Sequence, residues 1–126
     1  MLIKEVSEKF KLSQDTLRYY ERIGLIPAVP RNKSGIREYD QESLNWIEFN
    51  KCMRAAGLPI EALIEYVTLF QAGEATSQTR KEILVEQRDL LAKRIVEMQK
   101  TLERLDGKIE HYQRLQTCED RLGLTK

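Results

Sequence analysis

The sequence has few of the residues on which enzymes, metal sites and membrane segments are built. It holds one histidine, two cysteines and three prolines in 126 residues. There is no glycine-rich phosphate loop and no grouping of carboxylates with histidine, so we predict neither an enzyme nor a bound cofactor. Cys52 and Cys118 are too far apart in sequence for a metal-binding pattern. No apolar run approaches the roughly 20 residues that span a bilayer, so no membrane partner is expected.

The amino terminus also lacks the features of an export signal. Met1 is followed by the mixed segment Leu2–Glu5, which has no apolar core of the signal-peptide kind. We therefore expect the protein to stay in the cytoplasm. Reducing conditions there disfavour a structural disulfide.

Charge is abundant but unevenly spread. Charged residues make up 33% of the chain, yet its formal net charge is only +1. Residues 1–37 have an excess of lysine and arginine, whereas residues 38–71 have an excess of acids. A local basic face on a nearly neutral chain suits binding to a nucleic-acid backbone, although a solvated surface explains such a segment equally well.

Two short helices are predicted at the amino terminus. Ile3, Val6 and Phe10 recur at helical spacing and define the first. Ser13 is a suitable N-cap for the second, and Gly24 supplies its C-terminal stop. Two helices joined by so tight a turn form a helix-turn-helix.

A hairpin is predicted after the second helix. Pro27 and Pro30 hold this stretch extended and non-helical. Ser34–Gly35 has the composition of a hairpin turn, with short strands expected near 29–32 and 36–39. This hairpin would be the wing of a winged helix-turn-helix.

Two more helices complete the predicted head. The third begins after its cap Asp40 and ends at Gly57, and the fourth runs from Pro59 to Gln71. None of the four helices can bury its apolar stripe alone, so they must share one core. In the third and fourth helices, the residues expected to face that core are Leu44, Trp46, Ile47, Phe49, Met53, Leu63, Val67 and Phe70.

One long helix is predicted from Thr79 to Leu115, where the chain has no proline. Its apolar residues follow a heptad pattern typical of a coiled-coil seam. The seam consists of Leu84, Leu91, Ile95, Met98, Leu102, Leu105, Ile109 and Tyr112. The alternative is that this helix folds back on its own head. The helix is much longer than the head, which favours a homodimer.

These patterns predict a mainly α fold, with a winged helix-turn-helix head followed by a long C-terminal coiled-coil dimerisation helix. The predicted parts are a DNA-binding domain with linker helices over residues 1–71, a connector over 72–78, the dimerisation helix over 79–115 and a C-terminal tail over 116–126. A DNA-reading head on a dimerising rod suggests a two-fold-symmetric transcription regulator.

The chain resembles the MerR family of bacterial transcription regulators. The matching segments are Ile3–Val6, Thr16–Glu21 with Gly24–Ile26, Ser34–Tyr39 and Arg54–Leu58. The resemblance implies a homodimer with an antiparallel coiled coil. It also implies binding to double-stranded promoter DNA whose spacer is too long, which the regulator bends and untwists so that RNA polymerase is affected indirectly through the promoter.

The resemblance also implies roles for individual residues. Arg18 is the best candidate for reading a base or gripping a phosphate, because its guanidinium can bind two acceptors. Alternatively, Tyr20 packs into the core and Arg37 merely pairs with an acid. The full set of expected DNA contacts is Thr16, Arg18, Tyr19 and Tyr20 in the recognition helix, Arg31, Lys33, Arg37 and Tyr39 in the wing, and Arg54 after it.

The sensing residue is less clear from the sequence. Cys118, even with Glu119 and Asp120, falls short of a soft-metal site, so no metal is expected. Considered alone, Cys52 is most simply a buried small hydrophobe. Its surroundings, Trp46–Arg54, resemble the NmlR/AdhR branch of the family, which responds to reactive aldehydes and related thiol-directed stress. That resemblance makes Cys52 the candidate sensor.

Two alternatives stay open at this point. The regulator could sense a noncovalent ligand, with Cys52 purely structural. The chain could instead be a coiled-coil scaffold whose head binds protein. The single histidine, His111, is expected to be a solvated residue of the rod.

Overall fold

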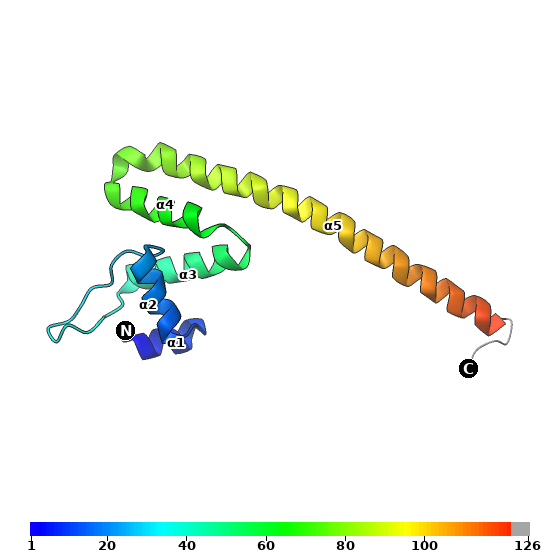
Figure 1. Ribbon diagram of the computed structural model, residues 1–126, viewed down its shortest axis with the longest axis horizontal. Coiled ribbons are helices and arrows are strands. Elements are labelled where there is room, and N and C mark those ends of the chain that lie inside the picture. Colours follow the sequence, from blue (N-terminus) through cyan, green and yellow to red (C-terminus); the bar gives the residue numbers. More distant parts are fainter. Residues whose placement is uncertain (122–126) are drawn as a thin grey trace. The chain divides into compact units, whose positions relative to one another are not determined.

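The computed structural model describes residues 1–121, with side chains up to Cys118 (Figure 1). Its helices in chain order are α1 (Ile3–Phe10), α2 (Gln14–Ile23), α3 (Gln41–Ala55), α4 (Ile60–Ala72), the short 3-10 helix η1 (Glu74–Thr76) and α5 (Ser77–Arg121). The chain divides into two compact units, Met1–Gln87 and Arg88–Lys126. The predicted mainly α fold, with a helix-turn-helix head and a long C-terminal helix, is confirmed.

The helix-turn-helix forms as its caps dictate. Lys11 ends α1 in the left-handed conformation, at φ 56°. The Ser13 side chain accepts a hydrogen bond from the Thr16 backbone N–H at 3.0 Å and so caps α2. Gly24 ends α2 at φ 84°, where a side chain would be strained and would lie 3.7 Å from Ile64. Local chemistry therefore fixes the C-terminal end of α1 and both ends of α2.

The wing differs from its prediction. Residues 24–40 extend from the helices as a loop (Figure 1), and strands were expected in two parts of it. The structure has a single antiparallel bridge there, between Arg31 and Arg37. Pro30 has no N–H for a ladder, and the Asn32 side chain accepts the N–H groups of Ser34 and Ile36 at 2.9 and 3.1 Å. Backbone bonds also close the hairpin, from the Asn32 N–H to the Ile36 carbonyl at 2.9 Å and from the Glu38 N–H to the Pro30 carbonyl at 2.8 Å. The hairpin is therefore held by a few backbone bonds and the Asn32 side chain, without regular strands.

Helices α3 and α4 pack antiparallel through an aromatic cluster. The ring centroid of Trp46 lies 5.0 Å from Phe70 and 5.9 Å from Tyr66, and Phe49 stacks on Tyr66 at 5.7 Å. Phe70 was predicted to face inward, but it is 39% exposed. It lies at the rim of the cluster, where its ring also meets the Arg80 guanidinium at 5.3 Å, so this prediction is wrong.

Helix α3 connects the helix-turn-helix to the rest of the core. Asn50 is fully buried, and its amide donates to the Leu25 carbonyl at 2.7 Å and to the Trp46 carbonyl at 2.9 Å. The neighbouring Lys51 ammonium donates to the Phe10 carbonyl at the end of α1. One turn of α3 thus holds the ends of both α1 and α2.

The chain reverses after α4, and the first turns of α5 run back beside it (Figure 1). Gly73, at φ 104°, begins the reversal, and the Thr76 hydroxyl donates to the Leu69 carbonyl at 2.7 Å. Helix α5 begins at Ser77 and ends at Arg121, so it extends beyond the predicted 79–115. Residues 116–121 are helical rather than a separate tail, and 122–126 lie outside the described residues.

The predicted seam is uncovered in the single chain. Seven of the eight seam side chains are between 37% exposed, at Leu84, and 69% exposed, at Met98. The eighth, Leu91, is half-buried. Among residues 1–121, every helix is too short or too polar to cross a bilayer.

We predict that Asp40 stabilises the head as the N-cap of α3. Its carboxylate accepts from the Ser43 backbone N–H and hydroxyl, both at 2.8 Å, and these bonds hold the pKa of Asp40 below its usual 3.8. Asp40→Ala should lower the free energy of unfolding at neutral pH by about 1 kcal/mol, measured by urea unfolding with Trp46 fluorescence.

The control is Asp40→Asn, which keeps the acceptor but not the charge. Because the folded pKa lies below the unfolded one, the charge-dependent stability is present above about pH 4 and is lost as pH falls through the folded pKa. Asp40→Asn should therefore stay close to wild type at pH 7 and lose this acid dependence. An unchanged urea midpoint of unfolding for Asp40→Ala would contradict the stabilising role of Asp40 as the N-cap.

Candidate nucleic-acid interface

The exposed side of α2 carries the first group of predicted contacts. Arg18 is about half exposed and is aligned along the helix by Asp15 at 3.0 Å. Tyr19 is 40% exposed, and its ring lies 5.3 Å from the guanidinium of Arg22. Thr16 is half-buried, and its hydroxyl is 2.8 Å from that of Ser13. The helix therefore presents two cations and one aromatic ring to solvent.

Two predicted contacts lie in the core instead. Tyr20 is 8% exposed and Tyr39 only 2%, and burial raises the pKa of both hydroxyls, so they stay protonated at neutral pH. Within residues 1–121 the Tyr39 hydroxyl has no hydrogen-bond partner. Burial removes both tyrosines from the exposed surface. For Tyr20, this matches the alternative left open by the sequence.

The wing presents its cations on a compact turn. The Arg31 guanidinium donates to the Gly35 carbonyl at 2.9 Å across the hairpin. Gly35 itself adopts φ 77°, a conformation that favours glycine, and its N–H donates to the Asn32 carbonyl at 2.9 Å. Lys33 is exposed at the tip. The turn chemistry predicted at Ser34–Gly35 is thus present without the predicted strands.

A single carboxylate joins the recognition helix to the wing. Glu21 of α2 accepts from the Val29 backbone N–H at 2.9 Å and from Arg37 Nε at 2.6 Å. The ion pair is largely shielded, with the side chains of Arg37 and Glu21 only 25% and 14% exposed. Glu21 therefore binds both the segment that leads into the wing, at Val29, and the segment that leads out of it, at Arg37. The sequence analysis allowed that Arg37 pairs with an acid, but it did not identify Glu21 as that acid.

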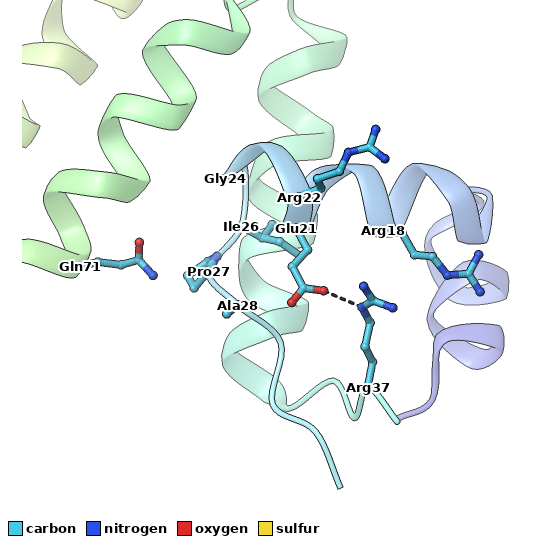
Figure 2. A pocket seen from close by; sticks show the side chains of 9 residues that line it. All are labelled: Arg18, Glu21, Arg22, Gly24, Ile26, Pro27, Ala28, Arg37 and Gln71. Atoms are coloured by element: carbon cyan, nitrogen blue, oxygen red, sulfur yellow. Dashed lines mark hydrogen bonds and ion pairs between the residues drawn. The ribbon is translucent and has the colours of Figure 1, made fainter. Parts of the chain in front are cut away.

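The Arg37–Glu21 pair borders a pocket of about 660 Å³ between α2 and the start of the wing (Figure 2). Arg18, Arg22 and Arg37 all line it, and Gln71 of α4 closes another side. Figure 2 shows the Glu21 carboxylate turned toward Arg37. The sequence analysis did not include Arg22 among the expected DNA contacts. Its spacing of four residues from Arg18 was the available signal, because that spacing places both on one helix face.

Arg54 and Cys52 lie elsewhere on α3. The Arg54 guanidinium donates to the Leu58 carbonyl at 2.7 Å, at the turn into α4. Cys52 is a free, exposed thiol, and so is Cys118. Among the described residues, no group of three or more His, Cys, Asp or Glu side chains is placed to hold a metal ion. The side chains of Glu119 and Asp120 lie outside the described part.

Known families match nearly the whole described chain. Residues 1–69 match the family "MerR HTH family regulatory protein" and residues 44–108 match "MerR, DNA binding". This chain belongs to the MerR family of DNA-binding transcription regulators. The resemblance found in the sequence is therefore confirmed, and family membership makes the chain a regulator rather than an enzyme.

One relative in the MerR family agrees with the branch predicted from Trp46–Arg54. The HTH-type transcriptional regulator AdhR of Bacillus subtilis is 59% identical over 91 residues. The aligned part spans 72% of this chain and 65% of AdhR, a little under two thirds of that protein's length.

Solved MerR-family structures share the fold. A putative MerR family regulator from Listeria monocytogenes has a TM-score of 0.95 at 52% identity, over 98% of this chain and 94% of the other. HiNmlR, a MerR family regulator lacking the sensor domain and bound to promoter DNA, has a TM-score of 0.83 at 25% identity, over 92% of each chain.

We predict that Glu21 is required to order the wing. Glu21→Ala removes the acceptor of the Val29 N–H and the partner of Arg37, and should lower the free energy of unfolding by about 1–3 kcal/mol. It should also speed hydrogen exchange at the Val29 amide, measured by NMR. Glu38→Ala removes an exposed carboxylate of the same hairpin and should change neither quantity. An unchanged hydrogen-exchange rate of the Val29 amide in Glu21→Ala would refute this role of Glu21.

Proposed function

We propose that the protein is a dimeric activator that binds and distorts promoters with an over-long spacer, in response to reactive aldehydes or thiol-directed stress through Cys52. It would act in the cytoplasm and reach RNA polymerase through the promoter. The observation that carries the proposal is the group of arginines from α2 and the wing that line one pocket, with Arg37 held by Glu21, in a chain 59% identical to AdhR over the aligned part.

The proposed DNA contacts follow from exposure and charge. Phosphate contacts from arginine and lysine position a protein on DNA, and base contacts then specify the site. Arg37 binds Glu21 through its Nε, so the two terminal nitrogens of its guanidinium remain as donors for a phosphate. The proposed contact set is Thr16, Arg18, Tyr19, Arg31, Lys33, Arg37 and Arg54, with Tyr20 and Tyr39 supporting it from the core.

The proposed homodimer rests on the exposed face of α5. Ile95, Met98, Leu102 and Leu105 are between 49% and 69% exposed on this helix. A heptad stripe that stays uncovered on one chain is the pattern buried between two helices of a coiled coil. Two heads carried on one dimer would bind two half-sites, as symmetric regulators do.

Cys52 is well placed for the proposed sensing. It is exposed, so an aldehyde can reach it, and it directly follows Asn50 and Lys51, which hold the ends of α2 and α1. Its thiolate would attack the aldehyde carbonyl carbon, forming a C–S bond while the carbonyl π electrons move to oxygen, which takes a proton. The adduct would crowd the turn of α3 that anchors the helix-turn-helix.

The activator role can be tested by in vitro transcription from the chain's own promoter region. We expect a small aldehyde such as formaldehyde to raise the amount of transcript made with wild-type protein. With Cys52→Ala, the amount of transcript should not change. Cys118→Ala is the matched control, since it removes the other exposed thiol, and it should respond like wild type. A promoter with a shortened spacer should need no protein, because its elements are already aligned.

Each other outcome has a distinct meaning. Response in both wild type and Cys52→Ala would make Cys52 structural and favour a noncovalent ligand. No response in either would exclude aldehyde as the inducer. Stimulation that persists unchanged on the shortened spacer would refute the distortion mechanism.

We predict that Met98 is buried in the dimer. A lysine inside the seam would place a charge in an apolar interface, so Met98→Lys should yield monomers by size-exclusion chromatography with light scattering. The control Val96→Lys adds the same charge at an exposed apolar position of the same helix outside the seam, and should remain dimeric. Dimers of unchanged stability in Met98→Lys would refute the proposed seam.

A further inference from the structure

A second groove lies on the side of Arg18 and Arg37 that faces away from the first pocket. It has a volume of about 420 Å³ and is formed where the first turn of α1, the helix α2 and the wing meet. Arg18 and Arg37 border both this groove and the pocket of Figure 2, whereas Arg22 borders only the pocket and Arg31 only the groove. The two hollows are therefore neighbouring parts of one surface.

The groove is strongly cationic. Lys4, Arg18, Arg31 and Arg37 line it from three different segments of the chain, and none of the residues lining it is acidic. Asp15 and Glu21 pair with two of these cations from outside the groove, so the lining itself stays positively charged. A positively charged lining attracts an anion.

Lys4 differs from the other three cations in its partners. Arg18 pairs with Asp15, Arg37 with Glu21, and Arg31 with the Gly35 carbonyl. The Lys4 side chain is exposed, and within residues 1–121 it makes no ion pair or hydrogen bond. Its ammonium is thus free to bind a ligand without breaking a contact.

The apolar rim of the groove adds a second property. Leu2 and Ile36 line it and are 45% and 53% exposed, so two aliphatic side chains stand beside the cations. A sugar–phosphate backbone offers both matching features, since each phosphate carries one negative charge and each deoxyribose presents C–H groups. A free inorganic anion would use the cations alone.

We propose that this groove binds a segment of the DNA sugar–phosphate backbone and that Lys4 is a phosphate ligand. The inference rests on the DNA binding of the family and adds to it a contact outside the recognition helix and the wing. The bound strand would pass from the pocket beside Arg22, across Arg18 and Arg37, to Lys4 and Arg31. The first turn of α1 thereby becomes part of the interface.

The test is the salt dependence of DNA binding, measured by fluorescence anisotropy with a labelled promoter fragment from about 50 to 200 mM KCl. Loss of one phosphate contact reduces the slope of log K against log salt by about 0.9. A dimer carries two copies of Lys4, so Lys4→Gln should reduce the slope by about 1.8 and bind roughly 60-fold more weakly near 0.1 M salt. The loss should be the same on promoter and scrambled duplexes, because a phosphate contact carries no sequence information.

Lys9→Gln is the matched control. Lys9 is an exposed lysine at the other end of the same helix, where its ammonium lies over the Phe10 ring and it does not border the groove. Its removal changes the net charge equally and should leave the slope at the wild-type value. Lys4→Arg should restore the slope.

Two results would overturn the proposal. One is a wild-type slope in Lys4→Gln, and the other is a loss confined to the promoter sequence, which would indicate a base contact. Competition by potassium phosphate beyond its ionic strength, seen for wild type but not for Lys4→Gln, would support a phosphate site at Lys4. If wild type showed no salt-dependent affinity at all, the DNA-binding function itself would fail for this chain, independently of Lys4.

Discussion

The geometry of the head depends on one carboxylate. Glu21 takes two donors that are far apart in the chain, the Val29 N–H at the entry of the wing and Arg37 on its return. Because Glu21 belongs to α2, any rotation of that helix carries the wing with it. Side chains of the helix and the wing can therefore keep a fixed spacing.

A second set of bonds extends this rigidity to α3. Asn50 and Lys51 bind the carbonyls of Leu25 and Phe10, so the ends of both short helices rest on one turn. A buried amide such as that of Asn50 is costly unless its donors are satisfied, and here they bind the Leu25 carbonyl just after α2 and the Trp46 carbonyl within α3. Chemistry at the neighbouring Cys52 would act on a part of the protein with little room to adjust.

The sequence predicted those features that depend on local chemistry. Helix caps, glycine stops and apolar periodicity are properties of a few adjacent residues, and the bounds of α1 to α4 follow them closely. It failed where distant residues decide the outcome. Nothing near Tyr39 shows that the core encloses it, and the position of Glu21 between Val29 and Arg37 exists only after the wing has folded back. Phe70 was misjudged because a helix stripe does not reveal where the core ends.

The construction of the wing has a consequence for self-association. A hairpin of paired strands exposes an edge whose regular N–H and carbonyl groups can recruit a strand from another molecule. Here the Asn32 side chain already binds two of the N–H groups, and Pro30 offers none. Most N–H groups between Pro30 and Ile36 are thus already bonded within the wing, so a second copy brought beside it would find few free donors at this turn.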